Sequence, residues 1–235
     1  MHVQQDETVV PRRERVRAST IEEIKATARR LMAESGTIEA RFTDIARAMG
    51  MTPPALYRYF SDRDALLTAL LTDGYNDLAD RLTAGGEDAG PADLWGRFTG
   101  IAHAYRAWAH QDHARYALVF GMPIPGYAAP VDGDTTMAAK RAMSALEAVL
   151  AEAHTRGELR PPMVAVHGPE LAEHLTMPGL PPEVHQAMMH TWMAMHGFVS
   201  LEIFGHLDMV PPAAREDLYG AQVRLSALAL GLVPR

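Results

Sequence analysis

The stretch from residue 43 to residue 60 constrains this fold more than any other, because its residues predict two short helices joined by one tight turn. Gly50 follows the first predicted helix, where a left-handed glycine ends a helix at least cost. Thr52 can cap the second helix, and Pro53 then occupies its first position, where a missing N–H costs nothing. These residues therefore predict a sharp turn between two short helices.

Small and apolar residues in the same stretch predict how the two helices cross. Ala46 is small where two helices must approach closely, and Leu56 is apolar where the second helix meets the first. Thr43 and Asp44 fit the start of the first helix, as a capping hydroxyl and as a negative charge at the positive end of the dipole. The pattern is typical of a DNA-binding helix-turn-helix, whose second helix enters the major groove. An ordinary helical hairpin, in which these residues only cap helices, is the alternative.

The composition argues against several classes of protein. The 235 residues include no cysteine, so a disulfide framework and a thiolate metal site are excluded. No apolar run approaches the ~20 residues of a membrane span, and the amino end lacks the pattern of a signal peptide, so we expect a cytoplasmic protein. The net charge of −7 argues against general nucleic-acid binding, yet the first 60 residues hold ten Lys and Arg against eight Asp and Glu. DNA contact confined to that end fits this distribution.

The residues before the helix-turn-helix are predicted to form a flexible basic arm over 1–17 and one helix. The basic residues of the arm are Arg12, Arg13, Arg15 and Arg17. Such an arm can reach phosphates or a minor groove, or it can be a solubilising tail. The helix is expected to begin at Thr20, with Glu23 completing a capping box, and to end at Gly36.

The rest of the chain is predicted to be helical throughout, without strand alternation. A linking helix over 61–84, capped by residues 61–64 and ended by Gly85 and Gly86, would span about 35 Å at ~1.5 Å per residue. Further helices are expected from residue 93 and over 114–120, 135–155, 169–176, 182–206 and 212–231, with an irregular proline-rich segment over 121–134. The predicted fold class is all-α, with a three-helix helix-turn-helix domain over 18–62 and a helical domain over 63–235.

Two sets of residues carry a family resemblance. The first comprises Phe42-Thr43, Ile45-Ala46, Met49-Gly50-Met51, Ala55-Leu56-Tyr57-Arg58-Tyr59-Phe60 and Ser61-Asp62-Arg63-Asp64-Ala65-Leu66-Leu67. The second comprises Tyr105, Trp108, Ala114-Arg115-Tyr116, Phe120-Gly121, Pro123-Ile124-Pro125-Gly126-Tyr127, and Trp192 with His196-Gly197. The first set resembles the tetracycline-repressor (TetR/AcrR) family of bacterial regulators. The second resembles a branch of that family with a Trp-His-Gly carboxyl-terminal domain.

The resemblance implies a homodimeric, ligand-responsive DNA-binding regulator, usually a repressor, that binds a double-stranded operator. The positions that match phosphate contacts are Thr43, Tyr57, Tyr59 and Arg63, and those that match groove-facing positions are Thr52, Pro53, Ala55 and Arg58. Pro53 and Pro54 depart from the family pattern because neither has a side-chain donor, so base recognition there must be apolar, by shape or by neighbours. Arg58 suits a bidentate guanine contact, with another phosphate contact as the alternative.

The carboxyl-terminal domain is expected to bind a small apolar or aromatic effector and to form the dimer. Candidate pocket residues are Tyr105, Trp108, Phe120, Met122, Met143, Met189, Trp192, Met193 and His196. Candidate dimer-interface residues are Met195, Val199, Leu218, Leu225 and Leu228. His196 would orient the ligand or brace the pocket, or it would be a core histidine bonded to a backbone carbonyl. For any single one of these residues ordinary core is the simpler interpretation, whereas the set as a whole favours a pocket, chiefly because of the family resemblance.

Two other classes of function fit parts of the sequence. A ligand-independent or partner-controlled regulator, or an activator, would have the same DNA-binding half. A helical metal-dependent enzyme is a remote alternative, suggested by the pairs Glu170/His174 and Glu202/His206, each one helical turn apart. The sequence has no His-Glu-x-x-His, Gly-x-Ser-x-Gly or phosphate-loop motif, and such pairs usually stabilise a helix face. We therefore expect no catalytic residue, no metal site and no cofactor.

Overall fold

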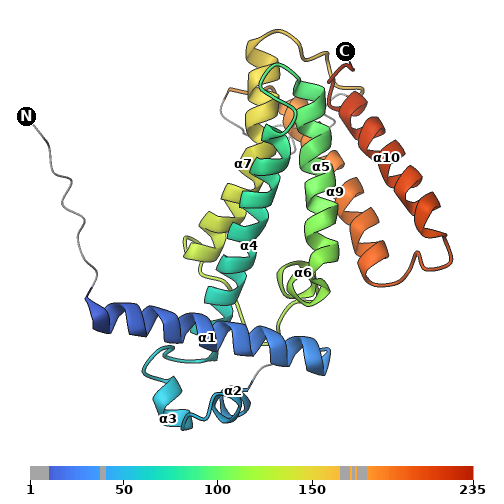
Figure 1. Cartoon of the computed structure of the whole chain (residues 1–235). Helices are drawn as coiled ribbons and strands as arrows, with labels where there is room; N and C mark the ends of the chain where they lie inside the picture. Colours follow the sequence, from blue (N-terminus) through green and yellow to red (C-terminus); the bar gives the residue numbers. More distant parts are fainter. Residues whose placement is uncertain (1–10, 38–40, 165–169, 171–172, 174–178, 235) are drawn as a thin grey trace, which may run out of the picture. The chain divides into compact units, whose positions relative to one another are not determined.

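The computed structural model describes residues 11–37, 41–164, 170, 173 and 179–234, and every regular element in these ranges is an α-helix (Figure 1). The all-α fold class is confirmed. The chain forms two compact units. Unit 1 is drawn from Met1–Thr72 and Ala114–Thr135, and unit 2 from Asp73–His113 and Thr136–Arg235. None of the described helices is long and apolar enough to cross a membrane.

Unit 1 is built around the helix-turn-helix. Its helices are α1 (Arg12–Ser35), α2 (Phe42–Ala48), α3 (Pro53–Leu56), the first part of α4 (Arg63–Glu87) and nearly all of α6 (His113–Phe120). Their buried side chains form one core: Ile24, Ala28, Met32, Phe42, Ile45, Ala46, Leu56, Phe60, Leu66, Leu67, Leu70, Leu71, Leu118 and Ile124. Two hydroxyl pairs, Thr68–Tyr127 at 3.0 Å and Thr72–Thr135 at 3.2 Å, also tie residues 114–135 to α4. The sequence predicted a domain boundary at residue 62, whereas unit 1 continues to Thr72 and also includes residues 114–135.

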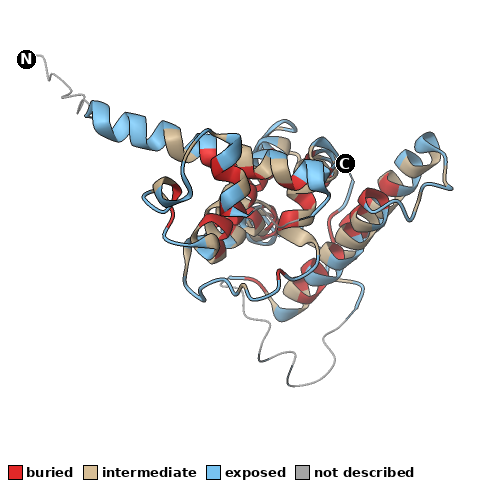
Figure 2. Ribbon diagram, turned by 90° about the horizontal axis from the view of Figure 1, so that it is seen from below, coloured by how far each residue is buried: buried red, intermediate tan, exposed pale blue. Residues whose placement is uncertain are grey.

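The first helix begins earlier than predicted. It starts at Arg12 rather than at Thr20, and the Thr20 hydroxyl donates to the carbonyl oxygen of Val16 inside the helix, at 2.9 Å. Residues 12–17 are therefore helical and not a flexible arm, because arginine and glutamate favour helix strongly. These first turns are exposed, whereas one side of the middle of α1 is buried (Figure 2). The rest of the predicted arm, residues 1–10, lies outside the described residues.

Unit 2 contains the later part of α4 and the remaining helices. They are α5 (Leu94–Gln111), α7 (Asp134–Thr155, from Thr136 in this unit), α9 (Pro182–Ile203) and α10 (Pro212–Ala229). All of these lie within a few residues of the predicted ranges. The structure also shows a cap at the start of α5, where Asp93 accepts the amide N–H of Gly96 at 2.8 Å. Most of the helix predicted over 169–176 lies outside the described residues.

The predicted end of the linking helix at Gly85 and Gly86 is wrong, because α4 continues through both glycines to Glu87. The glycines instead permit a close helix crossing. A Cβ atom added to Gly100 of α5 would stand 2.0 Å from the carbonyl oxygen of Gly85, and one added to Gly85 would stand 2.6 Å from the Cβ atom of Ala104. Only hydrogen fits between the two backbones at this point.

Candidate nucleic-acid interface and interior clusters

The turn between α2 and α3 has the predicted geometry. Gly50 is left-handed, with φ of +64°, and the amide of Met51 donates to the carbonyl oxygen of Ala46 at 2.8 Å. Ala46 and Leu56 are both fully buried in the core of unit 1. The small residue, the turn glycine and the buried leucine therefore hold the two helices in a helix-turn-helix.

The capping predictions for these helices are only partly right. Thr43 does not cap α2, because the helix begins one residue earlier and the carbonyl oxygen of Arg41 accepts the first amide bonds. Thr52 does precede α3, with Pro53 at the first position, but its hydroxyl makes no capping bond in the described part of the chain. At the start of α4, Asp62 accepts the amide N–H of Ala65 at 2.8 Å, which confirms the predicted cap.

The eight candidate DNA contacts all lie at the surface of unit 1. Thr43, Thr52, Pro53, Tyr57 and Arg58 are exposed, and Ala55, Tyr59 and Arg63 are half-buried. The α-helical part of α3 is a single turn, after which the amides of Arg58 and Tyr59 donate to carbonyl oxygens three residues back, at 3.3 and 2.9 Å. Residues 57–59 therefore form a tight turn that prolongs α3, the recognition turn.

Two aromatic contacts fix the tyrosines of this turn. The Tyr57 ring packs against Phe42, with 5.1 Å between ring centroids, although the side chain is 55% exposed. The guanidinium carbon of Arg17 lies 5.4 Å from the centre of the Tyr59 ring, and Nη1 of Arg17 donates to the carbonyl oxygen of Arg58 at 2.9 Å. The sequence offered no indication of the Arg17 contact, because its partners lie 41 and 42 residues further along the chain.

In unit 2, the structure brings together three of the candidate pocket residues. The hydroxyl of Tyr105 lies 2.8 Å from Nδ1 of His196, and the imidazole stacks on Trp192 with 5.1 Å between centroids. The other imidazole nitrogen, Nε2, lies 3.4 Å from the hydroxyl of Ser200. Burial lowers the pKa of His196 below its ordinary value of 6.5. His196 is thus held by the Tyr105 hydroxyl at one ring nitrogen and lies near the Ser200 hydroxyl at the other.

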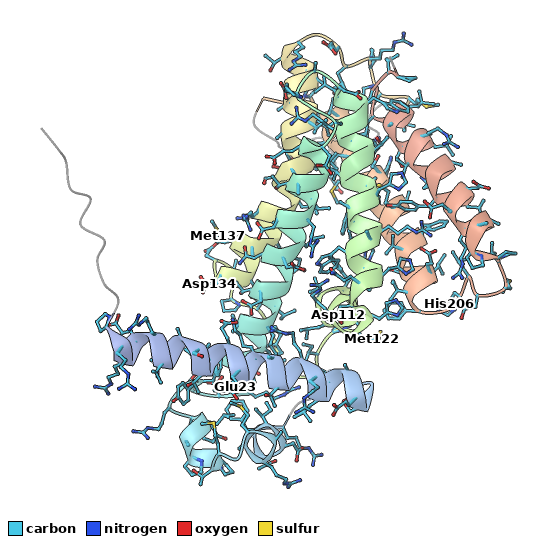
Figure 3. The ribbon with its side chains drawn as sticks, viewed as in Figure 1. Glu23, Asp112, Met122, Asp134, Met137 and His206 are labelled. Carbon is cyan, nitrogen blue, oxygen red and sulfur yellow. The ribbon has the colours of Figure 1, made fainter. Side chains whose placement is uncertain are left out.

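The other candidate pocket residues are not gathered at this cluster. Trp108 is buried and donates from Nε1 to Oδ2 of Asp77 at 2.8 Å. Met189 and Met193 are exposed, and Met143 is half-buried. Phe120 and Met122 belong to unit 1. The Met122 side chain, labelled in Figure 3, is exposed. Met122 and Met193 are therefore not cavity walls in this structure, because their side chains face solvent.

A cavity of about 390 Å³ in unit 2 is lined by none of the candidate pocket residues. Its lining comes from the end of α7, the following loop and the start of α9, namely His154, Leu159, Arg160, Pro161, Pro162, Pro181, Glu183 and Val184. The sequence did not single out this place, because its residues are mainly prolines and charged residues in connecting segments.

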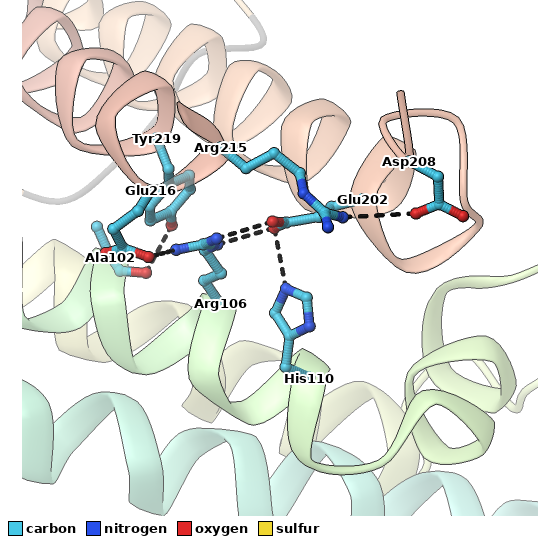
Figure 4. Close-up of polar contacts among 8 residues, drawn as sticks. All are labelled: Ala102, Arg106, His110, Glu202, Asp208, Arg215, Glu216 and Tyr219. Atoms are coloured by element: carbon cyan, nitrogen blue, oxygen red, sulfur yellow. Dashed lines mark hydrogen bonds and ion pairs between the residues drawn. The ribbon is translucent and has the colours of Figure 1, made fainter. Parts of the chain in front are cut away.

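A charged cluster that the sequence did not predict joins α5, α9 and α10 (Figure 4). The buried Glu202 accepts two hydrogen bonds from Arg106, at 2.7 and 2.8 Å, and lies 2.9 Å from Nε2 of His110. Arg106 also pairs with Glu216, and the Tyr219 hydroxyl donates to a backbone carbonyl of α5 at 2.6 Å. Burial raises the pKa of the Glu202 carboxyl, but the hydrogen bonds from Arg106 and His110 outweigh it and lower that pKa to about 2.

This cluster corrects the pairing of Glu202 with His206. Glu202 is buried against Arg106, whereas His206 is exposed (labelled in Figure 3). Within the described residues, no group of three or more histidine and acidic side chains is placed to hold a metal ion. His174, a member of the other pair, lies outside the described residues.

The candidate dimer-interface residues divide into two groups. Met195 and Val199 are buried inside unit 2, where α9 packs against α5 and α10, so their assignment to a subunit interface is corrected. Leu218, Leu225 and Leu228 on α10 are 50, 62 and 46% exposed. The exposed large apolar residues on and just after α9 are Met189, Met193, Leu201 and Phe204. The correction arises because α9 is apolar on more than one face, and the sequence does not say which face turns inward.

Comparison with known proteins agrees with this architecture. Residues 24–70 match the sequence model described as "Bacterial regulatory proteins, tetR family", and residues 98–225 match the "Tetracyclin repressor-like, C-terminal domain". The HTH-type transcriptional regulators Rv1816 of Mycobacterium tuberculosis and Mb1846 of Mycobacterium bovis are each 33% identical over 225 residues, 93% of this chain and 93% of theirs.

Solved structures show the same fold. The structure described as putative regulatory protein SCO4313 superposes with a TM-score of 0.74 at 34% identity, covering 92% of this chain and 98% of that one. The TetR family regulator PfmR from Thermus thermophilus superposes with a TM-score of 0.56 at 17% identity, covering 90% and 99%, which shows the fold alone. The Trp-His-Gly branch stays a prediction. The chain belongs to the TetR family of DNA-binding transcriptional regulators.

Proposed function

We propose that this regulator is a homodimeric repressor that binds a pseudo-palindromic operator and is released by a small apolar or aromatic molecule. One observation supports the DNA-binding part of this proposal. On the outward side of the helix-turn-helix, Thr52, Tyr57 and Arg58 are exposed, while Leu56 is buried beneath them. A DNA-binding repressor of this kind acts in the cytoplasm.

The side chains on this surface suit backbone contact and base recognition in different ways. Hydroxyls of Tyr57, Tyr59 and Thr43 and the guanidinium of Arg63 are donors that fix register on phosphates. Arg58 is the charged side chain of the recognition turn and is assigned to a guanine in the major groove. Pro53, with Thr52 and Ala55 beside it, presents apolar surface, which suits a thymine methyl or groove shape.

The proposed dimer uses the exposed apolar residues of α9 and α10. Leu218, Leu225 and Leu228 recur at helical spacing on α10, and such a stripe is normally covered by protein. Pairing α9 and α10 with the same helices of a second copy gives a four-helix interface, typical of large apolar obligate dimers. Two recognition helices held in this way match half-sites about 34–36 Å apart.

The proposed effector site is the Tyr105–Trp192–His196 cluster and its surroundings in unit 2. Two aromatic rings supply apolar contact, and the hydroxyl–imidazole pair supplies polar atoms that can orient a ligand. Helix α4 supplies residues to both units, so a ligand that displaces its later turns also acts on the helix that carries Arg63. A preference of ~1–3 kcal/mol for the non-binding state changes operator occupancy five- to a hundredfold.

The DNA-binding half is tested by selecting genomic fragments with the purified protein and measuring affinity for the recovered duplex and a scrambled duplex. Wild-type protein should prefer the recovered duplex at physiological salt. Tyr57→Phe and Arg63→Ala should weaken binding on all sequences, and Arg63→Ala should also reduce the slope of log K against log salt concentration by about one. Equal affinity of the wild type for both duplexes would contradict the proposal that the protein binds DNA at a specific sequence.

The effector half needs a separate experiment. Metabolites that release the protein from the recovered duplex are titrated by calorimetry into free protein and into the protein–DNA complex. Because linkage is reciprocal, bound operator should weaken ligand binding by the same factor by which ligand weakens operator binding. Identical ligand affinity in both titrations would exclude the allosteric scheme and favour a ligand-independent or partner-controlled regulator.

A further inference from the structure

We propose that Arg17 is a positioning residue for DNA recognition, which holds the recognition turn and Tyr59 in place instead of contacting a phosphate itself. The inference rests on the proposed role of α3 and the turn after it as the DNA-contacting element. It arises from one side chain that makes two contacts: Nη1 donates to the carbonyl oxygen of Arg58 at 2.9 Å, and the guanidinium lies over the Tyr59 ring at 5.4 Å.

The carbonyl contact falls where the recognition element needs external support. Carbonyl groups at the end of a helix lack intrahelical donors, and a cation there is stabilised by the helix dipole. The α-helical part of α3 is only four residues long, and so short a helix does not persist without tertiary contacts. Leu56 anchors its inner side in the core, and Arg17 anchors its far end.

The ring contact explains why the residue is an arginine. A planar guanidinium can lie over an aromatic face and donate hydrogen bonds at its edge at the same time, which a lysine ammonium cannot do. Tyr59 is half-buried beside this contact, so its ring is held from the α1 side. Its hydroxyl is one of the proposed phosphate contacts, and a fixed ring presents that hydroxyl in one position.

The helical periodicity of α1 places Arg17 correctly for this role. Arg17 precedes the buried Ile24 by seven residues, which is close to two turns, so both lie on the side of α1 that faces the core. Arg15 is exposed like Arg17, but it lies about 160° away around the same helix at ~100° per residue. The early start of α1 at Arg12 therefore extends the core-facing side by two turns and carries Arg17 over the recognition turn.

The salt dependence of binding to the recovered duplex separates positioning from phosphate contact. Arg17→Ala should weaken binding about tenfold, which corresponds to about 1.4 kcal/mol, while the slope against salt stays at the wild-type value. A phosphate contact would instead reduce that slope by about 0.9. Arg15→Ala is the matched control, since it removes the same charge from the opposite side of the same turns. Arg17→Lys should recover only part of the loss, because lysine cannot stack and donate together.

A double-mutant cycle tests whether Arg17 acts through Tyr59. In a Tyr59→Leu background, Arg17→Ala should cost clearly less than it does in the wild type, because one of its two partners has gone. Because the Arg17 side chain is exposed, the unfolding midpoint of Arg17→Ala should stay within a few degrees of the wild type. A slope reduced by about one, an unchanged operator affinity, or strictly additive losses would each overturn the proposal.

An experiment without DNA keeps this inference distinguishable from the proposed function. In free protein with labelled tyrosine rings, NMR should show the Tyr59 ring resonances shifted by Arg17→Ala and left in place by Arg15→Ala. If wild-type protein fails to prefer any duplex, the operator proposal fails, while the ring resonances still report the Arg17–Tyr59 contact. Tyr59 resonances that Arg17→Ala leaves unchanged would overturn the positioning role whatever the DNA measurements give.

Discussion

Tyr105 and His196, ninety-one residues apart, meet through a hydroxyl and an imidazole nitrogen 2.8 Å apart, joining α5 to α9. The imidazole stacks on Trp192, and burial lowers the pKa of His196, so the ring is neutral near pH 7. A neutral ring can either donate to or accept from the tyrosine hydroxyl, whereas a protonated one can only donate. Charge on this histidine is therefore unfavourable in the folded protein.

Protonation of His196 should make folding stability depend on pH. The pKa of His196 is lowered in the folded protein, whereas the ordinary pKa of histidine is 6.5. As the pH falls through 6.5, the unfolded state therefore binds more protons than the folded state. The free energy of unfolding should then decline between about pH 7 and pH 5, and His196→Gln should reduce that decline. Urea unfolding at several pH values measures it, with His206→Gln, an exposed histidine, as the control for losing a histidine. The same decline in wild type and His196→Gln would contradict the prediction.

Glu202 should be the most sensitive member of the charged cluster. Glu202→Gln leaves Arg106 and His110 facing a neutral side chain in a buried site and should lower the free energy of unfolding by about 2–3 kcal/mol. Glu216→Gln is the matched control, because its side chain is 61% exposed, and it should cost less than ~1 kcal/mol. Urea unfolding near pH 7 compares the two, and equal losses would show that burial does not govern this cluster.

The helix crossing at Gly100 should not tolerate a methyl group. Gly100→Ala would place its Cβ atom 2.0 Å from the backbone oxygen of Gly85, so α4 and α5 would have to separate, at a cost of about 1–3 kcal/mol. Gly220→Ala in α10 is the control, because its new Cβ atom would meet only the end of Arg224, at 3.6 Å. Alanine's higher helix propensity should make that variant neutral or more stable by up to ~1 kcal/mol. Thermal unfolding distinguishes the pair, and a Gly100→Ala variant as stable as wild type would refute the close crossing.

The exposed leucines of α10 should control assembly. Leu225→Glu or Leu228→Glu would bury an unpaired charge in the proposed subunit interface and should convert a dimer into a monomer at micromolar concentration. Light scattering measures the mass, with Val131→Glu, an exposed apolar residue of unit 1, as the control. A wild-type protein that is already monomeric at this concentration would rule out the interface.

Arg58 should determine preference at one base pair. Its side chain is exposed at the end of the recognition turn, and a bidentate contact to guanine discriminates by about 1–3 kcal/mol. Arg58→Ala should therefore bind all four bases at that position with nearly equal affinity, as measured with a series of singly substituted duplexes. Uniform weakening over the whole series would instead assign Arg58 to a phosphate.

Local chemistry was sufficient to predict much of unit 1. The turn at Gly50, the first position of α3 at Pro53 and the cap at Asp62 are each determined by residues within a few positions of one another. Local patterns also located α5 and α7 within a residue or two. The start of α1 was missed because a run of arginines was interpreted by its charge, although its helix propensity decides the structure.

Contacts between distant segments could not be predicted in this way. Two glycines in succession predict a helix end, and only the approach of Gly100 from another helix shows why they lie inside α4. Sequence spacing pairs Glu202 with its neighbour His206, whereas its partner Arg106 lies 96 residues earlier. A single sequence does not reveal which residues on distant helices will come into contact, because these contacts depend on how whole helices pack.

Residues 114–135 belong to unit 1 although they follow residues of unit 2 in the sequence, and this affects how the DNA-binding part of such regulators can be exchanged. Leu118 and Ile124 lie in the same core as Leu56, so the part of the molecule that carries the recognition turn is assembled from two separate stretches of sequence. A chimera that takes only residues 1–72 from this chain would lack these two core side chains, or would have those of the other protein in their place. Exchange of operator specificity between relatives should therefore succeed by replacing surface residues of the turn, or by transferring both stretches together, and not by a single crossover within α4.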